Sequence, residues 1–305
     1  MNPLTIRKLK KFSITPYLYL FPAFFMLSVF IYYSIFTGFG YSFRVFRDFE
    51  PGGFVGFKNY VDAFNNDDFI NSIKSTLIWV FMTATIPTFA GLLLAVLVYY
   101  QTKGRVVSGV ARTILFMPMM MSAVAVGLLW SLIYNPLLGL LNQLLHAIKA
   151  IPEGTYVGFL ENPKTALYEA FVPMVWQSAG FSMVIFSAAL QGIPVDIREA
   201  AVLDGASKIK EIWHIVIPFI APTIISLVTV NMISGFKAFD LLKVLTHGGP
   251  ADSTMIVSLY MYTQAFSAWK FGYSSAVAVV LFMSILVSVF LFSLIARRWV
   301  GKSQK

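Results

Sequence analysis

The sequence contains no cysteine, and charged residues make up only 12% of its 305 residues. The absence of cysteine excludes disulfides, thiolate metal sites and cysteine nucleophiles. A typical soluble domain carries about 25% charged residues, so this chain has far fewer charges than a water-exposed surface normally uses. Hydrophobic residues make up 58% of the chain, and its mean hydropathy is +0.74. This composition excludes a soluble globular enzyme and a disordered chain, and it indicates a membrane protein.

Long apolar runs predict six membrane-spanning helices. The hydrocarbon core of a bilayer is about 30 Å thick and requires about 20 apolar residues in a helix. The first run follows a basic segment, as a signal peptide does, but it is too long for one and lacks a small-residue cleavage site, so we expect an uncleaved span. The predicted fold class is an all-α integral membrane domain over residues 15–296, between basic ends at 1–14 and 297–305. The six predicted spans are 15–37, 74–100, 114–134, 168–190, 217–236 and 274–296.

The basic residues gather in alternate loops between these spans. If the N-terminus lies inside, the inner pieces are 1–14, 101–113, 191–216 and 297–305, and they hold 14 Lys and Arg against four acidic residues. The rest of the chain holds nine basic and ten acidic residues. The positive-inside rule therefore predicts that both termini are cytoplasmic. It also accounts for the net charge of +9 without a nucleic-acid partner.

Motifs of catalysis and of ATP binding are missing from the sequence. No Walker A motif occurs, and the nearest match, at residues 301–303, has Ala296 where the first glycine is required. His146, His214 and His247 are scattered, so we expect no metal site. The centres of the six spans hold no charged residue, whereas a proton-coupled carrier normally needs one. The sequence therefore predicts a non-catalytic membrane protein, with a self-contained secondary carrier or channel as a minor alternative.

The inner loop at residues 191–218 is patterned to form two short helices. Asp196 followed by Glu199 is typical of a helix start, and Gly205 supplies a left-handed residue that ends a helix. Ser207 is expected to cap a second short helix, and Pro218 to lie in the first turn of the next span. Helices of about two turns are not stable alone in water. We expect them to dock, either on the inner surface of this protein or on a separate protein.

This loop resembles the EAA loop of binding-protein-dependent ABC importers, in which E-A-A, three residues, G, nine residues and I-x-L-P follow one another. All anchors are present at that spacing, with Ile217 in place of leucine as the one departure. The stretch at 245–250, Leu-Thr-His-Gly-Gly-Pro, resembles the first of the two permease subunits in carbohydrate-type importers of the maltose and glycerol-phosphate branch. The resemblance covers about residues 15–300. The loop residues that it assigns to coupling with an ATPase are Glu199, Ala200, Ala201, Asp204, Gly205, Ile215, Ile217 and Pro218.

The resemblance implies a pore-forming subunit in the cytoplasmic membrane of a bacterium or archaeon. Its implied partners are a second homologous permease, an ABC ATPase dimer that binds ATP and Mg²⁺, and an extracytoplasmic solute-binding protein. The implied substrate is a sugar, expected to be an oligosaccharide taken up by alternating access, with glycerol phosphate or another polar solute as the alternative. For Glu199 two interpretations stay open: a cap of its own helix, or an ion pair with a basic residue of the ATPase.

Polar residues inside the predicted spans are the candidates for the substrate pathway. They are Gln177 in the fourth span and Asn231, Ser234 and Gly235 in the fifth. An unpaired amide in hydrocarbon costs roughly 4–8 kcal/mol, so each either bonds a neighbouring helix or lines a wet cavity. Both interpretations stay open, although Gly235 also suits close helix packing. Tryptophans near span ends, among them Trp79, are expected to form an interfacial aromatic belt.

Overall fold

The computed structural model describes residues 14–47, 49–101, 105–152 and 154–303, and most of them are helical. The N-terminal basic piece predicted at 1–14 therefore lies almost wholly outside the described residues. A short hairpin adds two strands, β1 (Arg44–Arg47) and β2 (Glu50–Phe54). The α-helices are α1 (Thr15–Met26), α2 (Tyr33–Ser42), α3 (Lys58–Phe64), α4 (Asp67–Gln101), α5 (Arg105–Phe116), α6 (Ala123–Ile133), α7 (Leu140–Ala147), α8 (Ala166–Gln191), α9 (Val195–Leu203), α10 (Lys208–Glu211), α11 (Ile217–Phe236), α12 (Asp240–Leu245), α13 (Val257–Phe266) and α14 (Phe271–Ser303).

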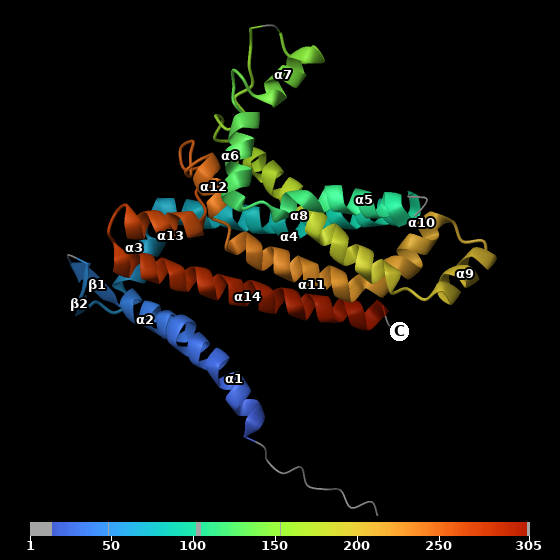
Figure 1. The fold of residues 1–305 in the computed structure, drawn as a ribbon. Coiled ribbons are helices and arrows are strands. Elements are labelled where there is room, and N and C mark those ends of the chain that lie inside the picture. Colours follow the sequence, from blue (N-terminus) through green and yellow to red (C-terminus); the bar gives the residue numbers. More distant parts are fainter. Residues whose placement is uncertain (1–13, 48, 102–104, 153, 304–305) are drawn as a thin grey trace, which may run out of the picture.

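Four long helices, α4, α8, α11 and α14, form the central bundle (Figure 1). In lipid every backbone N–H and C=O must be paired within the protein, and a helix pairs them inside one segment. One buried cluster joins α4, α6, α8 and α12 around Trp79, Phe171 and Leu242. A second joins α4, α8 and α11 around Met183, Phe186 and Ile220. The bundle is therefore packed along most of its length, with α4 at the centre of both clusters.

Five helices of the described chain are long and apolar enough to cross a membrane, and a sixth span is possible if one bent pair counts as one. The five are Pro16–Ser42, Asp67–Tyr100, Ala166–Gln191, Lys208–Phe236 and Phe271–Arg297. They correspond to all of the predicted spans except the third, so the predicted all-α membrane fold is confirmed.

The third predicted span, 114–134, is not one straight helix. Its two halves, Val107–Met120 and Ala123–Ile133, are bent by 98° relative to each other. The break contains Pro118 within a 3₁₀ turn (Met117–Met120), and proline removes a helical hydrogen bond. Ser122 then caps α6, because its hydroxyl accepts a hydrogen bond from the Ala125 N–H at 3.2 Å. The prediction of a continuous helix was therefore wrong at this point.

The fifth spanning helix starts earlier than the sequence suggested. Ser207 caps a helix as predicted, accepting a bond from the Lys210 N–H, but this helix continues without a break from Lys208 to Phe236. Pro218 therefore lies inside the helix, and the expectation of a separate short helix before it was wrong. A π turn (Ile212–Val216) precedes the proline, and the N–H of Ile217 bonds to the carbonyl of Ile212. This wider turn accommodates a residue that has no N–H to donate.

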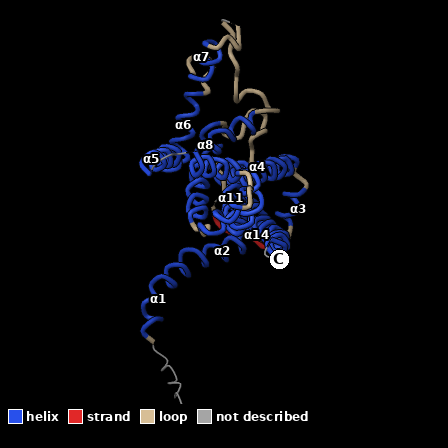
Figure 2. The backbone as a smooth tube through the Cα atoms, turned by 90° about the vertical axis from the view of Figure 1, so that its right-hand side faces the viewer, coloured by secondary structure: helices blue, strands red, loops and turns tan. Residues whose placement is uncertain are grey.

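The N-terminal helix points away from the bundle. A second π segment (Leu27–Tyr32) joins α1 to α2, and the apolar window of this first span is not buried at all. Figure 2 shows α1 and α7 projecting in opposite directions from the central helices. The residues Tyr19 and Phe36 are 83% and 73% exposed. A large apolar helical surface of the chain is thus left uncovered.

The two ends of the bundle carry different elements. The loop helix α9, the start of α10 and the end of α14 lie at one end, while the hairpin, α3 and α13 lie at the other (Figure 1). We call these the loop end and the hairpin end. The predicted inner loop and the basic C-terminal segment are therefore on the same side.

Candidate functional site: a cavity in the bundle and a loop at its end

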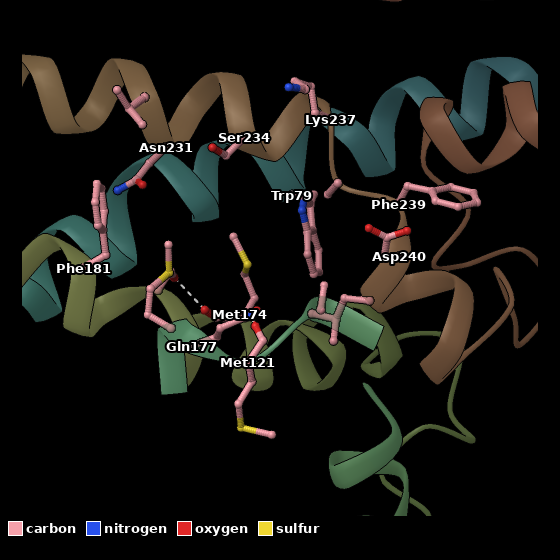
Figure 3. A pocket seen from close by; sticks show the side chains of 16 residues that line it. Trp79, Met121, Met174, Gln177, Phe181, Asn231, Ser234, Lys237, Phe239 and Asp240 are labelled. Atoms are coloured by element: carbon pink, nitrogen blue, oxygen red, sulfur yellow. Dashed lines mark hydrogen bonds between the residues drawn. The ribbon is translucent and has the colours of Figure 1, made fainter. Parts of the chain in front are cut away.

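A cavity of about 490 Å³ lies between α4, α8, α11 and α12, beside the break between α5 and α6. Figure 3 shows side chains from these elements pointing toward one common space. Its wall is mostly apolar, with a few polar groups contributed by separate helices. The polar residues of the wall are Gln177, Ser178, Asn231, Ser234, Lys237 and Asp240. A few polar groups in an apolar wall are typical of small-molecule sites.

The structure brings three of the four predicted pathway residues together around this cavity: Gln177, Asn231 and Ser234. Gly235 lies outside the wall and is buried where α11 crosses α4. A Cβ atom added to Gly235 would lie 3.1 Å from the Cα atom of Val80 and 3.1 Å from the Cβ atom of Thr83. The glycine therefore serves close helix packing in this structure.

Gln177 satisfies a carbonyl that the bent third span leaves open. Its amide nitrogen donates a hydrogen bond of 2.8 Å to the carbonyl oxygen of Met121, directly before α6 (Figure 3). An unpaired carbonyl at membrane depth costs several kcal/mol. Gln177 thus stabilises the break and at the same time faces the cavity.

Asn231 joins three helices at the cavity wall. Its amide donates to the hydroxyl of Thr88 on α4 at 2.9 Å and to that of Ser182 on α8 at 3.5 Å. Asn231 is 5% exposed, and both of its partners are buried as well. The helix-bonding interpretation is therefore satisfied by the geometry, and the position on the cavity wall leaves the substrate interpretation open too.

Trp79 lies in the bundle, although the sequence predicted a place for it in an interfacial aromatic belt. It is fully buried in the core of the bundle, so it does not belong to an interfacial belt. The spanning helix begins at Asp67 and not at residue 74, which places Trp79 deeper than its position in the apolar run suggested. Its indole N–H has no hydrogen-bond partner in the described chain, and the ring lines the cavity (Figure 3). A buried donor without a partner is costly unless a ligand or a water molecule accepts a hydrogen bond from it.

The inner loop presents its EAA residues at the loop end of the bundle. Gly205 follows α9 with a φ of +72°, the left-handed conformation predicted for it. Glu199 and Ala200 are exposed, whereas Ala201 is buried. Exposed apolar side chains follow them along the loop: Leu203 is 87%, Ile209 70% and Trp213 64% exposed.

The remaining predicted coupling residues differ in how far they are exposed. Asp204 is exposed beside Gly205, but Ile215, Ile217 and Pro218 are half-buried in the continuous helix that leads into the bundle. The Glu199 side chain forms no hydrogen bond or ion pair with the other described residues. The carboxylate therefore points to solvent from the middle of α9.

Sequence reasoning missed Arg198, the neighbour of Glu199. Its Nε atom lies 2.8 Å from the carboxylate of Glu211, and its Nη1 atom donates a 2.6 Å hydrogen bond to the hydroxyl of Tyr99. Partial burial opposes the charged form, but the bond to Glu211 and the surrounding charges leave the pKa of Arg198 above its ordinary value. An Arg and a Glu thirteen residues apart across a predicted turn were the only signal available.

A second cavity, of about 460 Å³, opens at the hairpin end between β1, α3, α13 and the start of α14. Its wall is more polar than that of the first and includes Asp62, Asp68, Lys270 and the exposed Trp269. The pKa of Tyr260 in this wall is raised, mainly by burial and then by its hydrogen bond with Tyr273. Its hydroxyl is therefore neutral. Across the described residues, no three His, Asp or Glu side chains come together as metal ligands.

The chain is similar to membrane components of transporters. The family described as "Binding-protein-dependent transport system inner membrane component" matches residues 76–301. A probable ABC transporter permease of Pyrococcus horikoshii is 33% identical over 90% of this chain and 93% of its own length. The trehalose/maltose transport system permease protein MalF of Thermococcus litoralis is 30% identical over 88% and 89%. A chain from the bacterial alginate ABC transporter, solved in complex with an alginate pentasaccharide-bound periplasmic protein, has the same fold, with a TM-score of 0.82, 23% identity and coverage of 94% and 95%.

Proposed function

The chain belongs to the family of binding-protein-dependent transport system inner membrane components, and we propose that it forms half of the membrane pathway of an ATP-driven sugar importer. It is a non-catalytic, multi-pass membrane subunit. In the proposal, ATP and Mg²⁺ bind to a separate ATPase dimer, and this chain converts closure of that dimer into alternating access to its cavity. The loop end then faces the cytoplasm, together with both termini.

The observation that carries the proposal is the exposed apolar surface of the inner loop. Leu203 at the end of α9, and Ile209 and Trp213 on the helix that follows, are mostly exposed, although the chain has a large core in which such residues could be buried. Contiguous exposed apolar side chains mark sites of protein interaction. A short helix such as α9 also gains stability by docking. Together with the spacing of the EAA motif, this surface supports docking to the ATPase.

The bundle cavity supports a hydroxyl-rich solute. Asn231, Ser234 and Asp240 contribute amide, hydroxyl and carboxylate groups to its wall, and the buried indole of Trp79 behind them has an unpaired N–H. Sugar hydroxyls both donate and accept hydrogen bonds, so they match this mixture of groups. Glycerol phosphate is the alternative solute, and Lys237 is the cavity residue that suits its charge.

The exposed N-terminal helix supports a second permease subunit. No residue in the apolar window of the first span is buried, and side chains such as Tyr19 and Phe36 are exposed well beyond the bundle. Lipid covers such a surface, but only a protein partner gives a projecting helix a fixed position. We propose that α1 packs against the second, homologous permease.

The polar cavity at the hairpin end supports an external solute-binding protein. It lies at the opposite end of the bundle from the loop, which is the extracytoplasmic end in this proposal. Its charged residues Arg44, Asp62, Asp68 and Lys270 form no ion pair with one another among the described residues. They are therefore available to a soluble partner.

The test is recovery of partners with the tagged chain after mild detergent extraction. We expect a Walker-motif ATPase and a second EAA-containing permease to co-purify with the wild-type chain. With Leu203→Asp, we expect the second permease still to co-purify but the ATPase to be lost. The matched control is Leu138→Asp, at a residue that is 79% exposed outside the loop. The proposal fails if the wild-type chain is recovered alone and still takes up solute after reconstitution, as a secondary carrier would.

A further inference from the structure

Glu211 is the only charged residue that is buried among those the structure describes, with 5% of its surface exposed. It lies at the end of α10, at the loop end of the bundle. A buried carboxylate is costly unless a countercharge accompanies it. The countercharge is Arg198 on α9, and this is also the only ion pair in the described part of the chain.

Arg198 binds a third element besides α9 and α10. Its Nη1 atom donates to the hydroxyl of Tyr99, at the inner end of α4, at 2.6 Å. Its guanidinium carbon lies 4.9 Å from the ring centre of Tyr99 and 5.6 Å from that of Tyr100. The planar guanidinium thus donates hydrogen bonds from its edge and also contacts the aromatic rings, a combination that the ammonium group of a lysine does not provide. We call Arg198, Glu211 and Tyr99 the Arg198 cluster.

Arg198 and Glu199 are adjacent on α9, and successive side chains of a helix project about 100° apart, so the two face different sides of the coupling helix. Glu199 is exposed, whereas Arg198 is partly buried against α4 and α10. Because α9 is one short continuous helix, a displacement imposed at Glu199 also displaces Arg198. The cluster passes this displacement to two helices, α4 through Tyr99 and the α10–α11 helix through Glu211.

These two helices both reach the bundle cavity. Trp79 of α4 lies 20 residues before Tyr99, which is about 30 Å along a helix, and Asn231 lies on the continuous helix that contains Glu211. Helices transmit axial displacement because their backbone hydrogen bonds and packing resist stretching. The cluster therefore connects the exposed loop surface with two walls of the cavity.

We propose that Arg198 is a positioning residue that holds the coupling helix to α4 and α11, so that movement of the ATPase is transmitted to the cavity. This inference rests on the proposed function, because it assumes that an ATPase docks at Glu199. The cluster sets the position of α9 and does not contact the ATPase or the solute itself.

The experiment measures solute molecules imported per ATP hydrolysed by the complete importer in proteoliposomes, with its ATPase and binding protein. Maltose and trehalose serve as the first solutes. For Arg198→Gln we expect this ratio to fall about tenfold, a typical size of coupling between sites, while the ATPase stays bound. Tyr99→Phe, which keeps the ring but removes the hydroxyl, gives a smaller fall. Lys210→Gln, an exposed basic residue of the same loop, is the control and leaves the ratio unchanged.

A double variant separates coupling from folding. Arg198→Gln alone leaves Glu211 buried without a countercharge, and this lowers the yield of folded subunit, and with it the amount of complex, although the folded subunit still binds the ATPase. Arg198→Gln with Glu211→Gln removes both charges, so we expect the amount of complex to recover while the transport ratio stays low. A wild-type ratio in the double variant overturns the proposal for the cluster. If instead the wild-type chain binds no ATPase at all, the proposed function fails, and the two failures are thus distinguishable.

Discussion

Replacing Asn231 by leucine tests whether this residue only joins helices or also binds solute. The side chain is buried at the cavity wall, and its amide donates to Thr88 at 2.9 Å and, more weakly, to Ser182 at 3.5 Å. Leucine is similar in size, so the substitution removes hydrogen bonds without opening a large void. Thr88 keeps its own bond to the carbonyl oxygen of Ala84.

The structural cost of Asn231→Leu follows from these contacts. Hydrogen bonds between helices in a membrane contribute about 0.6 kcal/mol on average and about 1.7 kcal/mol at most. One good bond and one long bond are lost, so we expect the free energy of unfolding to fall by about 1–2 kcal/mol. Such a loss leaves the subunit folded and assembled. If the amide also binds a sugar hydroxyl, the solute loses a further bond worth about 1 kcal/mol or more, or about five- to tenfold in KM.

The assay compares uptake by Asn231→Leu with uptake by Thr88→Val in the reconstituted importer. Thr88→Val breaks the same bond between α4 and α11 but leaves the amide in the cavity wall. We expect both variants to lose thermal stability, because both lack the bond between Asn231 and Thr88, and a KM for uptake that is raised at least about fivefold only in Asn231→Leu. Equal KM values in both variants would refute solute binding by Asn231 and leave it as a helix-joining residue.

Two glycines give the remaining predictions. Gly205→Val places a β-branched residue at φ +72°, at a cost of about 1–2 kcal/mol; we expect normal membrane insertion but ATP hydrolysis without uptake, whereas Gly205→Asn, which tolerates this conformation, retains transport. Normal uptake by the valine variant would contradict the coupling role. Gly235→Leu forces a side chain against Val80 and Thr83, so overpacking lowers stability by about 1–3 kcal/mol. The Tm of the purified subunit measures this loss, with Ser234→Ala as a control that leaves the Tm unchanged.

The helical membrane fold could be predicted because lipid restricts the chain to so few alternatives. An apolar run of the right length has to pair its own backbone, so length and hydropathy suffice for helices such as α8 and α14. Gly205 and the cap at Ser207 could also be predicted, because helix ends depend on residues that are close together in the sequence. The hairpin Arg44–Phe54 carries no comparable signal and was not predicted.

The departures from prediction arise where a local signal depends on its neighbours. Pro118 and Pro218 are both prolines in apolar runs, yet the first accompanies a 98° bend and the second lies in a continuous helix after a π turn. The carbonyl of Met121 at the bend is satisfied by Gln177, which lies 56 residues along the chain. Nothing in the local sequence at Pro118 shows that such a partner exists. A hydropathy profile therefore cannot distinguish the two prolines.

The candidate site was predicted in part for the same reason. Polar residues are rare in a spanning helix, so Asn231, Ser234 and Gln177 could be predicted as candidates, and all three line the cavity. Trp79 is an ordinary apolar residue in sequence, and only the packing of the bundle shows that its indole N–H is buried and unpaired. Arg198 was overlooked because its partner Tyr99 lies on another helix.

The contacts along the bundle differ in strength in a way that suits alternating access. In the middle, α4, α8 and α11 are joined by neutral hydrogen bonds from Asn231, each worth about 0.6 kcal/mol, close to the thermal energy. At the loop end, α4 and the α10–α11 helix are joined through α9 by the charge-assisted bonds of Arg198 to Tyr99 and Glu211, and such bonds are about twice as strong as neutral ones. A displacement applied at the loop end thus moves helices that are held firmly there, while the bonds beside the cavity break and re-form at little cost. We therefore expect the helices to shift relative to one another beside the cavity and not at the loop end.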